Sequence, residues 1–258
     1  MVLTAELKKD DTHGWYQFRA FEKQNIIAAF STRRLHLNFS PDKPDSVVIE
    51  ERKHFCQSVG VAFDSLVGLE QVHGANITRV ARADRGRGGR SQDEAIRGTD
   101  AALTDSLDVV LSVRTADCAP LFFLDPGRGA IGMAHIGWRG AKAGLASKMV
   151  QAFRREFLTK PEDLIVAVGP AIRHCCYEVG AELKRVFKSF VTRRRGRYYF
   201  DLVSWILDRL RREGIRHEQV YDSGFCTVCL NDQFPSRRRE GSIVSPMLSV
   251  LGRGCHAS

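Results

Sequence analysis

Residues 108–135 read DVVLSVRTADCAPLFFLDPGRGAIGMAH, a stretch with three apolar segments separated by short turns. Asp108–Thr115, Leu121–Leu124 and Ala130–His135 each have the length and the apolar character of a β-strand. Gly and Pro residues lie between them, as is typical of turns that connect strands. This stretch therefore predicts the central strands of a sheet.

Strand-like and helix-like patterns continue on both sides of this stretch. Helices are expected at 45–59, 181–190 and 201–214, and further strands at 26–30, 66–72, 77–81, 164–168 and 219–221. Apolar residues also recur at helical spacing after the turn Gly137–Gly140, at Ala141, Leu145, Met149, Phe153 and Phe157. We predict an α/β fold, with α+β as the alternative: one layered domain over residues 1–258, with a mixed sheet and flanking helices.

The composition is that of a soluble globular protein, with 43% hydrophobic and 27% charged residues. The N-terminus has no apolar h-region, and no apolar run approaches the length of a membrane span. We therefore expect a cytoplasmic protein with no membrane partner. Seven scattered cysteines favour reduced thiols over a disulfide framework. A monomer is the default expectation for a domain of this size.

Much of the formal net charge of +9 lies in three groups of arginines. They are Arg82, Arg85, Arg87 and Arg90; Arg193, Arg194, Arg195 and Arg197; and Arg237, Arg238 and Arg239. A basic surface attracts polyanions, but no nucleic-acid-binding motif accompanies these groups. We interpret them as solvated loops and expect no nucleic-acid partner. The polar, Gly-rich segment 83–98 is interpreted as a mobile surface loop.

Three segments each place a metal-ligating residue where an apolar strand meets a turn that contains Gly or Pro. The residues are His73 in Gln71–Gly74, Cys118 in Thr115–Pro120 and His135 in Ala134–Gly140. Each residue alone is more often structural, but one thiolate and two imidazoles together form a good ligand set for Zn²⁺. Three protein ligands leave a position open for water or substrate, so the combination predicts a catalytic metal site. Cu²⁺ is the alternative ion because such donors bind it more tightly.

A second cysteine pattern competes with this site. Cys226 and Cys229 form a CxxC motif, which alone is a weak sign of a metal or redox site. A structural zinc needs two more ligands, which Cys175 and Cys176 could supply. The interpretation we favour from the sequence is that Cys176 and Cys226 line or support a pocket.

Several ordered motifs resemble those of the laccase-domain family, also called the multicopper polyphenol oxidase or YfiH-type family. They are Phe30–Arg33, Gln71–Gly74, Arg97–Ala101, Thr115–Pro120, Ala134–Gly140, Gly169–Ile172 with Cys175–Gly180, and Cys226–Thr227 with Ser236–Arg238. Members of this family are described as purine nucleoside phosphorylases with adenosine deaminase activity, and some as peptidoglycan editing factors. Two departures, a shortened loop after Arg33 and Arg173–His174 in place of Gly-Pro, affect the expected lip of the pocket.

The resemblance implies that His73, Cys118 and His135 bind zinc, and that the partners are a purine nucleoside and phosphate. The expected reactions are phosphorolysis of adenosine, inosine or methylthioadenosine, and deamination of adenosine by a metal-activated water. The residues expected to take part in catalysis are Asp117 as a proton shuttle, Arg139 as a phosphate contact, and Cys118. The residues expected to contact the substrate are Arg33, Asp100, Cys176 and Tyr177.

Other functions remain open from the sequence. In a Cys–His hydrolase or amidase acting on peptidoglycan-type or other amide substrates, Cys118 would be the nucleophile and His135 or His73 its base. A polyanion-binding module would use the arginine groups instead, but it leaves the three ligands without a purpose. The laccase chemistry itself does not fit, because one His₂Cys site cannot form a multinuclear copper cluster and no His-x-His pair is present.

Overall fold

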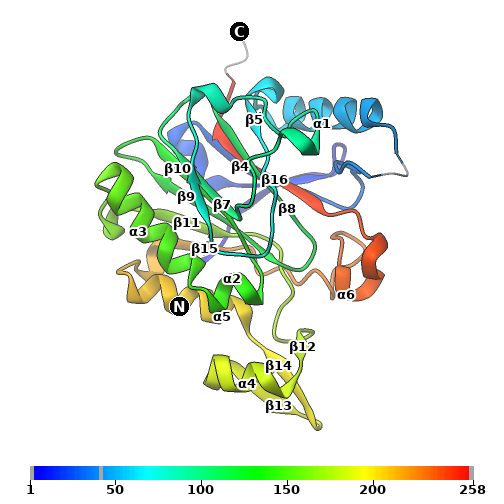
Figure 1. Cartoon of the computed structure of the whole chain (residues 1–258), viewed down its shortest axis with the longest axis vertical. Coiled ribbons are helices and arrows are strands. Elements are labelled where there is room, and N and C mark those ends of the chain that lie inside the picture. The colour runs from blue at the N-terminus through cyan, green and yellow to red at the C-terminus, as the bar shows by residue number, and fades with distance from the viewer. Residues whose placement is uncertain (1–2, 41–42, 256–258) are drawn as a thin grey trace.

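The computed structural model describes residues 3–40 and 43–255 and contains three sheets within them (Figure 1). The largest sheet has seven strands, in the spatial order β1 (Leu3–Thr4), β15 (Val220–Asp222), β11 (Ile165–Val168), β9 (Ala119–Asp125), β10 (Ala130–Ile136), β7 (Ala101–Thr104) and β6 (Ile77–Arg79). The central strands β11, β9, β10 and β7 pair antiparallel, whereas β6 and β15 pair parallel with their neighbours. The expected mixed sheet is confirmed.

A second sheet has six strands and packs face to face against the first. Its order is β2 (Leu7–Asp10), β3 (Trp15–Phe18), β4 (Ile26–Ser31), β16 (Met247–Arg253), β8 (Val110–Thr115) and β5 (Leu66–Val67). The third sheet is small and has the order β12 (Glu178–Val179), β14 (Arg197–Phe200) and β13 (Val191–Arg194). With the helix α4 (Ala181–Phe187) it forms a lobe that projects from one end of the body (Figure 1).

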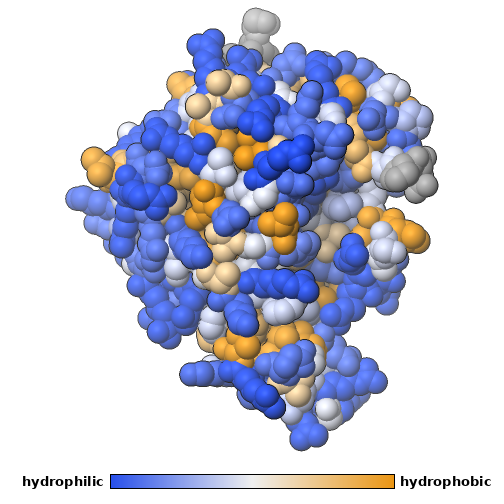
Figure 2. All heavy atoms as spheres, in the orientation of Figure 1, coloured by the Kyte–Doolittle hydropathy of each residue, from blue (hydrophilic) through white to orange (hydrophobic). Residues whose placement is uncertain are grey.

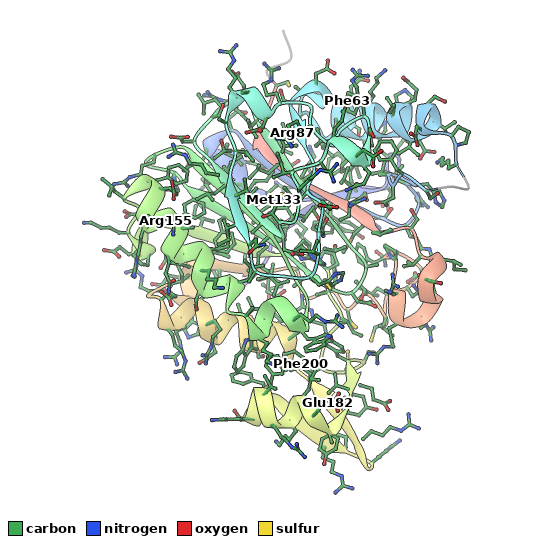
Figure 3. The ribbon with its side chains drawn as sticks, viewed as in Figure 1. Phe63, Arg87, Met133, Arg155, Glu182 and Phe200 are labelled. Atoms are coloured by element: carbon green, nitrogen blue, oxygen red, sulfur yellow. The ribbon has the colours of Figure 1, made fainter. Side chains whose placement is uncertain are left out.

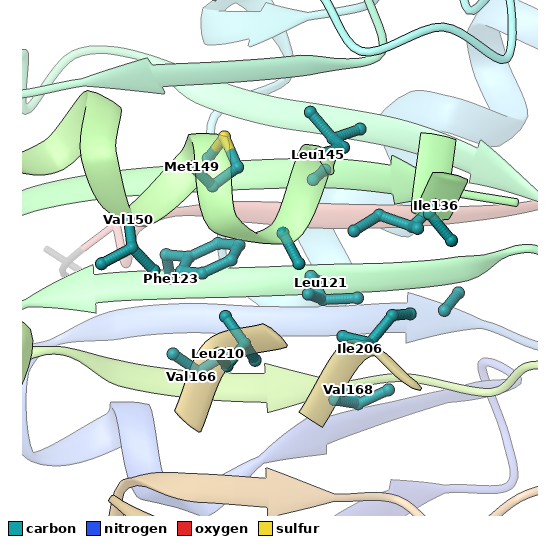
Figure 4. Packing of buried hydrophobic residues seen from close by; sticks show 14 of the residues in the cluster. Leu121, Phe123, Ile136, Leu145, Met149, Val150, Val166, Val168, Ile206 and Leu210 are labelled. Carbon is teal, nitrogen blue, oxygen red and sulfur yellow. The ribbon is translucent and has the colours of Figure 1, made fainter. Parts of the chain in front are cut away.

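The helix α1 (Asp45–Val59) covers the outer face of the six-stranded sheet, and α3 (Leu145–Phe157) and α5 (Leu202–Arg212) cover that of the seven-stranded sheet. The other helices are the short α2 (Trp138–Lys142), which follows β10, α4 in the small lobe, and α6 (Arg237–Glu240). The strand β9 shows how the layers form, because successive side chains of a strand point to opposite faces. Phe123 joins the core under α3 and α5, and Phe122 joins the core between the sheets. Figure 4 shows the first of these cores, with Met149 of α3 packed over the sheet.

The remaining core lies between the six-stranded sheet and α1, which contributes Phe55 and Val59 to it. The chain therefore folds into four layers: α1, the six-stranded sheet, the seven-stranded sheet, and α3 with α5. Met133 lies in the middle of this body, whereas Glu182 lies in the small lobe (Figure 3). The face in Figure 2 is largely hydrophilic. None of the helices within 3–40 and 43–255 combines the length and apolarity needed to cross a bilayer.

Several expected elements are confirmed and others differ in informative ways. The helix 45–59 has the expected bounds and ends at Gly60 with a φ of 85°. The helix expected after residue 140 is interrupted at Gly144, whose φ of 78° separates α2 from α3. The strand expected at 66–72 ends at Val67, because the N–H groups of Gly68 and Glu70 then bind the carbonyls of Arg87 and Ile96 in a neighbouring loop.

The segment 83–98 is held more firmly than the mobile loop expected from its composition. The buried guanidinium of Arg52 donates hydrogen bonds to the carbonyl oxygens of Gly88 and Gly89, at 2.8 and 3.0 Å. Gly68 donates its N–H to the carbonyl of Arg87 at 2.8 Å, and a Cβ at Gly68 would lie 3.1 Å from the oxygen of Gly88. Glycine therefore allows two backbone segments to approach closely here.

Candidate metal centre

Three side chains from distant parts of the sequence converge at one end of the central strands of the seven-stranded sheet. The ligand atoms of His73, Cys118 and His135 all lie within 4.8 Å of one another. The two imidazole rings are nearly perpendicular, with centroids 4.8 Å apart. In the β9–β10 ladder Ile136 faces Ala119, so Cys118 lies just before the start of β9, beside the residues that follow β10. The strand register therefore brings Cys118 to His135.

A buried carboxylate, Asp100, positions both histidines. Its Oδ1 accepts hydrogen bonds from Nδ1 of His135 at 2.8 Å and from the backbone N–H of His73 at 2.9 Å. Its Oδ2 accepts the N–H groups of Gly74 at 2.6 Å and Val72 at 3.3 Å. Because the carboxylate binds the Nδ1–H of His135, the Nε2 atom is the nitrogen left to bind a metal, with release of its proton.

The electrostatics of the site suit a cation. Burial raises the pKa of the Cys118 thiol, but the charge of His135 and hydrogen bonds from both imidazoles together lower it to about 6. Burial lowers the pKa of His135, but the Cys118 thiolate and the Asp100 carboxylate raise it to about 9. The sulfur is therefore held as a thiolate, which is the form that binds metals. This donor set fits Zn²⁺ with three protein ligands.

Local backbone strain accompanies the ligands. His73 has a φ of 60° and Asp117 a φ of 87°, although neither residue is a glycine. Such conformations cost about 1–3 kcal/mol each and cluster at functional sites, where the surrounding structure holds them. Gly137 is required for a different reason, because a Cβ there would lie 2.8 Å from the Sγ of Cys118. The turn after β10 therefore closes directly onto the thiolate.

Two adjoining cavities open beside these ligands. The first has a volume of about 270 Å³ and has aromatic and cationic side chains in its wall, namely Trp138, Tyr177, Arg139, Arg237 and Arg238. The second, of about 240 Å³, is lined by Gln71, Arg114, His135, Val244 and Pro246. His73, Cys118 and Arg237 border both cavities. The candidate metal ligands thus lie where the two cavities meet.

Three other residues expected from the sequence also line the first cavity: Asp117, Arg139 and Tyr177. The Arg139 guanidinium lies 4.6 Å from the Trp138 ring centroid, so it stacks on that ring while it borders the cavity. Both carboxylate oxygens of Asp117 are engaged, by the Thr227 hydroxyl at 2.6 Å and the backbone N–H of Arg238 at 2.7 Å. Both oxygens of Asp117 thus accept hydrogen bonds from the protein while the residue borders the first cavity; its expected role as a proton shuttle stays a prediction.

The remaining three lie elsewhere. Arg33 donates hydrogen bonds to Glu240 at 3.0 Å and to the carbonyl of Asn231, and it borders a separate cavity. Asp100 is fully buried and lies behind the ligands, where its carboxylate is enclosed by donors. Cys176 packs among other cysteines. Within the described part of the chain, these three residues are not among those that line the two cavities beside the candidate ligands; their expected contacts with a substrate stay a prediction.

Sequence reasoning missed Arg237 and Arg238, which were grouped with solvated loops. Arg238 donates a hydrogen bond to the carbonyl of Glu178 at 2.8 Å and lies 5.6 Å from the ring centroid of Tyr177. The signal was present in the sequence, because Ser236–Arg238 belongs to one of the motifs that carried the resemblance. The short α6 helix, capped by Ser236, orients both arginines towards the first cavity.

The four-layer body and its His₂Cys cluster define a candidate mononuclear metalloprotein with an aromatic, cationic cavity. Residues 25–253 match the family model described as multi-copper polyphenol oxidoreductase laccase, and the chain belongs to this family. The resemblance found in the sequence motifs is thereby confirmed.

Relatives in this family carry enzyme names. The purine nucleoside phosphorylase YlmD of Geobacillus stearothermophilus is 32% identical over 233 residues, which cover 87% of this chain and 84% of that protein. Adenosine deaminase RL5, from an unknown prokaryotic organism, is 30% identical over 203 residues, covering 75% and 77% of the two chains. The crystal structure of YlmD from G. stearothermophilus superposes with a TM-score of 0.90 at 29% identity, over 97% of this chain and 99% of that one.

Proposed function

We propose that the chain is a zinc-dependent purine nucleoside enzyme. It cleaves adenosine, inosine or methylthioadenosine with phosphate, and it deaminates adenosine. The observation that carries the proposal is the convergence of His73, Cys118 and His135 where two cavities meet. The names of the relatives support the substrate class, since they include both a purine nucleoside phosphorylase and an adenosine deaminase.

The three candidate ligands would bind the metal, and the cavities would bind the substrate. His73, Cys118 and His135 would hold the zinc, with the Nε2 of His135 directed by Asp100. When bound, a zinc ion with an open position lowers the pKa of a water from about 15.7 to about 7. Three protein ligands leave that position free, and the cavities on either side of His73 and Cys118 give a substrate access to it.

The first cavity offers suitable contacts for a nucleoside and phosphate. Trp138 and Tyr177 present flat apolar surfaces against which a purine can stack. Arg139 and Arg238 present cationic donors at the same wall, and guanidinium groups bind phosphate through paired hydrogen bonds. Arg237 borders both cavities, so it can contact a group that bridges them.

Asp117, which also borders the first cavity, supports this arrangement through hydrogen bonds. It binds the backbone N–H of Arg238 and the Thr227 hydroxyl, which fixes the start of α6 against the turn before β9. It also directly precedes Cys118. We assign it to positioning the Arg238 segment relative to the thiolate.

The test uses zinc-loaded protein with adenosine, with and without phosphate, and separates products by chromatography. Phosphorolysis gives adenine and deamination gives inosine, so each reaction has its own product. His135→Ala should abolish both products, whereas His54→Ala, at an exposed position on α1, should leave them unchanged. Unchanged turnover in His135→Ala would rule out the proposal.

One observation favours a second function, a Cys–His hydrolase or amidase. The Nδ1 of His135 binds Asp100 at 2.8 Å while His135 hydrogen-bonds Cys118, which is the order of groups in a catalytic triad. Zinc separates the two functions, because a zinc-bound thiolate is a poor nucleophile. Fast alkylation of Cys118 by iodoacetamide in zinc-treated protein, unaffected by a chelator, would favour the hydrolase. Protection by zinc that a chelator removes would favour the nucleoside enzyme.

A further inference from the structure

Four cysteines outside the His73–Cys118–His135 site gather where two loops meet. The Sγ of Cys175 lies 3.5 Å from that of Cys226 and 3.6 Å from that of Cys229. The Sγ of Cys176 lies 3.4 Å from that of Cys229, and all four sulfurs lie within 4.8 Å of one another. We call this group the four-cysteine cluster.

The backbone builds this cluster without help from the thiols. Ala171 and Cys226 form a parallel β-bridge, in which the N–H of Thr227 donates to the carbonyl of Ala171 at 3.2 Å. The guanidinium of Arg173 makes two hydrogen bonds to Asp222, at 2.6 and 2.7 Å, and so ties the first loop to β15. The two loops are therefore fixed to each other beside the cysteines.

The sulfur separations favour a shared ion over disulfides. A disulfide bond is about 2.05 Å long. A tetrahedral zinc tetrathiolate with bonds of about 2.3 Å has sulfurs about 3.75 Å apart. The three sulfur–sulfur contacts of 3.4–3.6 Å lie close to that second value.

The loop chemistry points the same way. The spacing of Cys226 and Cys229 is that of a zinc knuckle, in which two ligands come from one turn. Backbone N–H groups of Arg173, Val228 and Cys229 hydrogen-bond Cys226, as expected around a metal-bound thiolate. All four cysteines are free of disulfides.

We propose that the four-cysteine cluster binds a second zinc ion as a closed structural site, distinct from the open His₂Cys site. Four protein ligands fill the tetrahedral shell and leave no position for a substrate. The site lies at the base of the small lobe, since Cys176 directly precedes Tyr177 and β12. Its second loop carries Thr227, which hydrogen-bonds Asp117. A zinc ion here would hold one wall of the first cavity in place.

The test counts zinc in protein purified under reducing conditions, by plasma mass spectrometry. Wild-type protein should carry two equivalents per chain. The double variant His73→Ala, Cys118→Ser should keep one, and Cys226→Ser, Cys229→Ser should lose one. Cys255→Ser, an exposed thiol outside the cluster, is the matched control and should keep two.

A spectroscopic measurement covers the case in which the Cys226 and Cys229 variant fails to fold. In the His73→Ala, Cys118→Ser background, zinc X-ray absorption should show four sulfur neighbours at about 2.3 Å and no imidazole. One zinc equivalent in the wild type that disappears in this background would overturn the proposal. Peptide mapping that finds the four cysteines joined as disulfides in fresh protein would overturn it too. Neither outcome depends on which reaction the His₂Cys site performs.

Discussion

Replacing Asp100 by Asn should weaken zinc binding by the His73–Cys118–His135 site and destabilise the metal-free chain. The Asp100 carboxylate accepts four hydrogen bonds, two at each oxygen. An asparagine has one acceptor oxygen, so its amide group must face two of the four donors. If the oxygen keeps Gly74, the amide faces Nδ1 of His135 and the N–H of His73.

The magnitude follows from these contacts. Each buried donor left without an acceptor costs about 1–3 kcal/mol, so two cost about 2–6 kcal/mol of unfolding free energy. His135 can avoid this cost if its proton moves from Nδ1 to Nε2, but Nε2 then has no lone pair with which to bind a metal. Changes to such supporting groups lower metal affinity about 10- to 100-fold. That range corresponds to about 1.4–2.8 kcal/mol of binding free energy.

Two assays measure these effects separately. Competition with a chromophoric chelator gives the zinc affinity, and urea unfolding of chelator-treated protein gives the stability of the metal-free chain. Asp105→Asn is the control, because Asp105 forms an exposed ion pair with Arg79 at 3.0 Å. It should change stability by less than about 1 kcal/mol and leave zinc affinity unchanged. If Asp100→Asn binds zinc as tightly as the wild type, the positioning role assigned to Asp100 is wrong.

Three further outcomes test the site and the core. Gly137→Ala should lower zinc affinity by about tenfold or more in the chelator competition, because its Cβ would lie 2.8 Å from the Sγ of Cys118. Arg139→Ala should raise the KM for phosphate while adenosine deamination, assayed without phosphate, is retained; equal losses in both reactions would contradict a phosphate contact. Gly132→Ala should lower the unfolding free energy by about 1–3 kcal/mol in urea, because a Cβ on β10 would lie 2.8 Å from the Phe153 ring. An unchanged urea midpoint would show that α3 moves away from the added methyl group with no loss of unfolding free energy.

Much of the architecture could be predicted because it rests on local pattern. The apolar runs of β9 and β10 and the helical spacing of α3 are visible in any short window of the sequence. Short edge strands such as β12 carry no such pattern, and their existence depends on pairing with partners about 20 residues away. The packing of two sheets against each other also escaped prediction, because alternation assigns β9 side chains to two faces without saying what covers each.

The candidate site likewise has features that local sequence shows and features that depend on long-range contacts. Each of the three candidate metal ligands could be found because its own strand and turn mark it. Asp100 was expected only to contact a substrate, since only the fold shows the four donors around its carboxylate. Asp117 is the clearest case, because its φ of 87° and its bond to Thr227, 110 residues away, are both set by tertiary structure. That bond joins the residue before Cys118 to the residue after Cys226. One buried hydrogen bond therefore links the His₂Cys site to the four-cysteine cluster. A shift of the loop that carries Cys226 should displace Thr227 and Asp117, and with them the neighbouring Cys118.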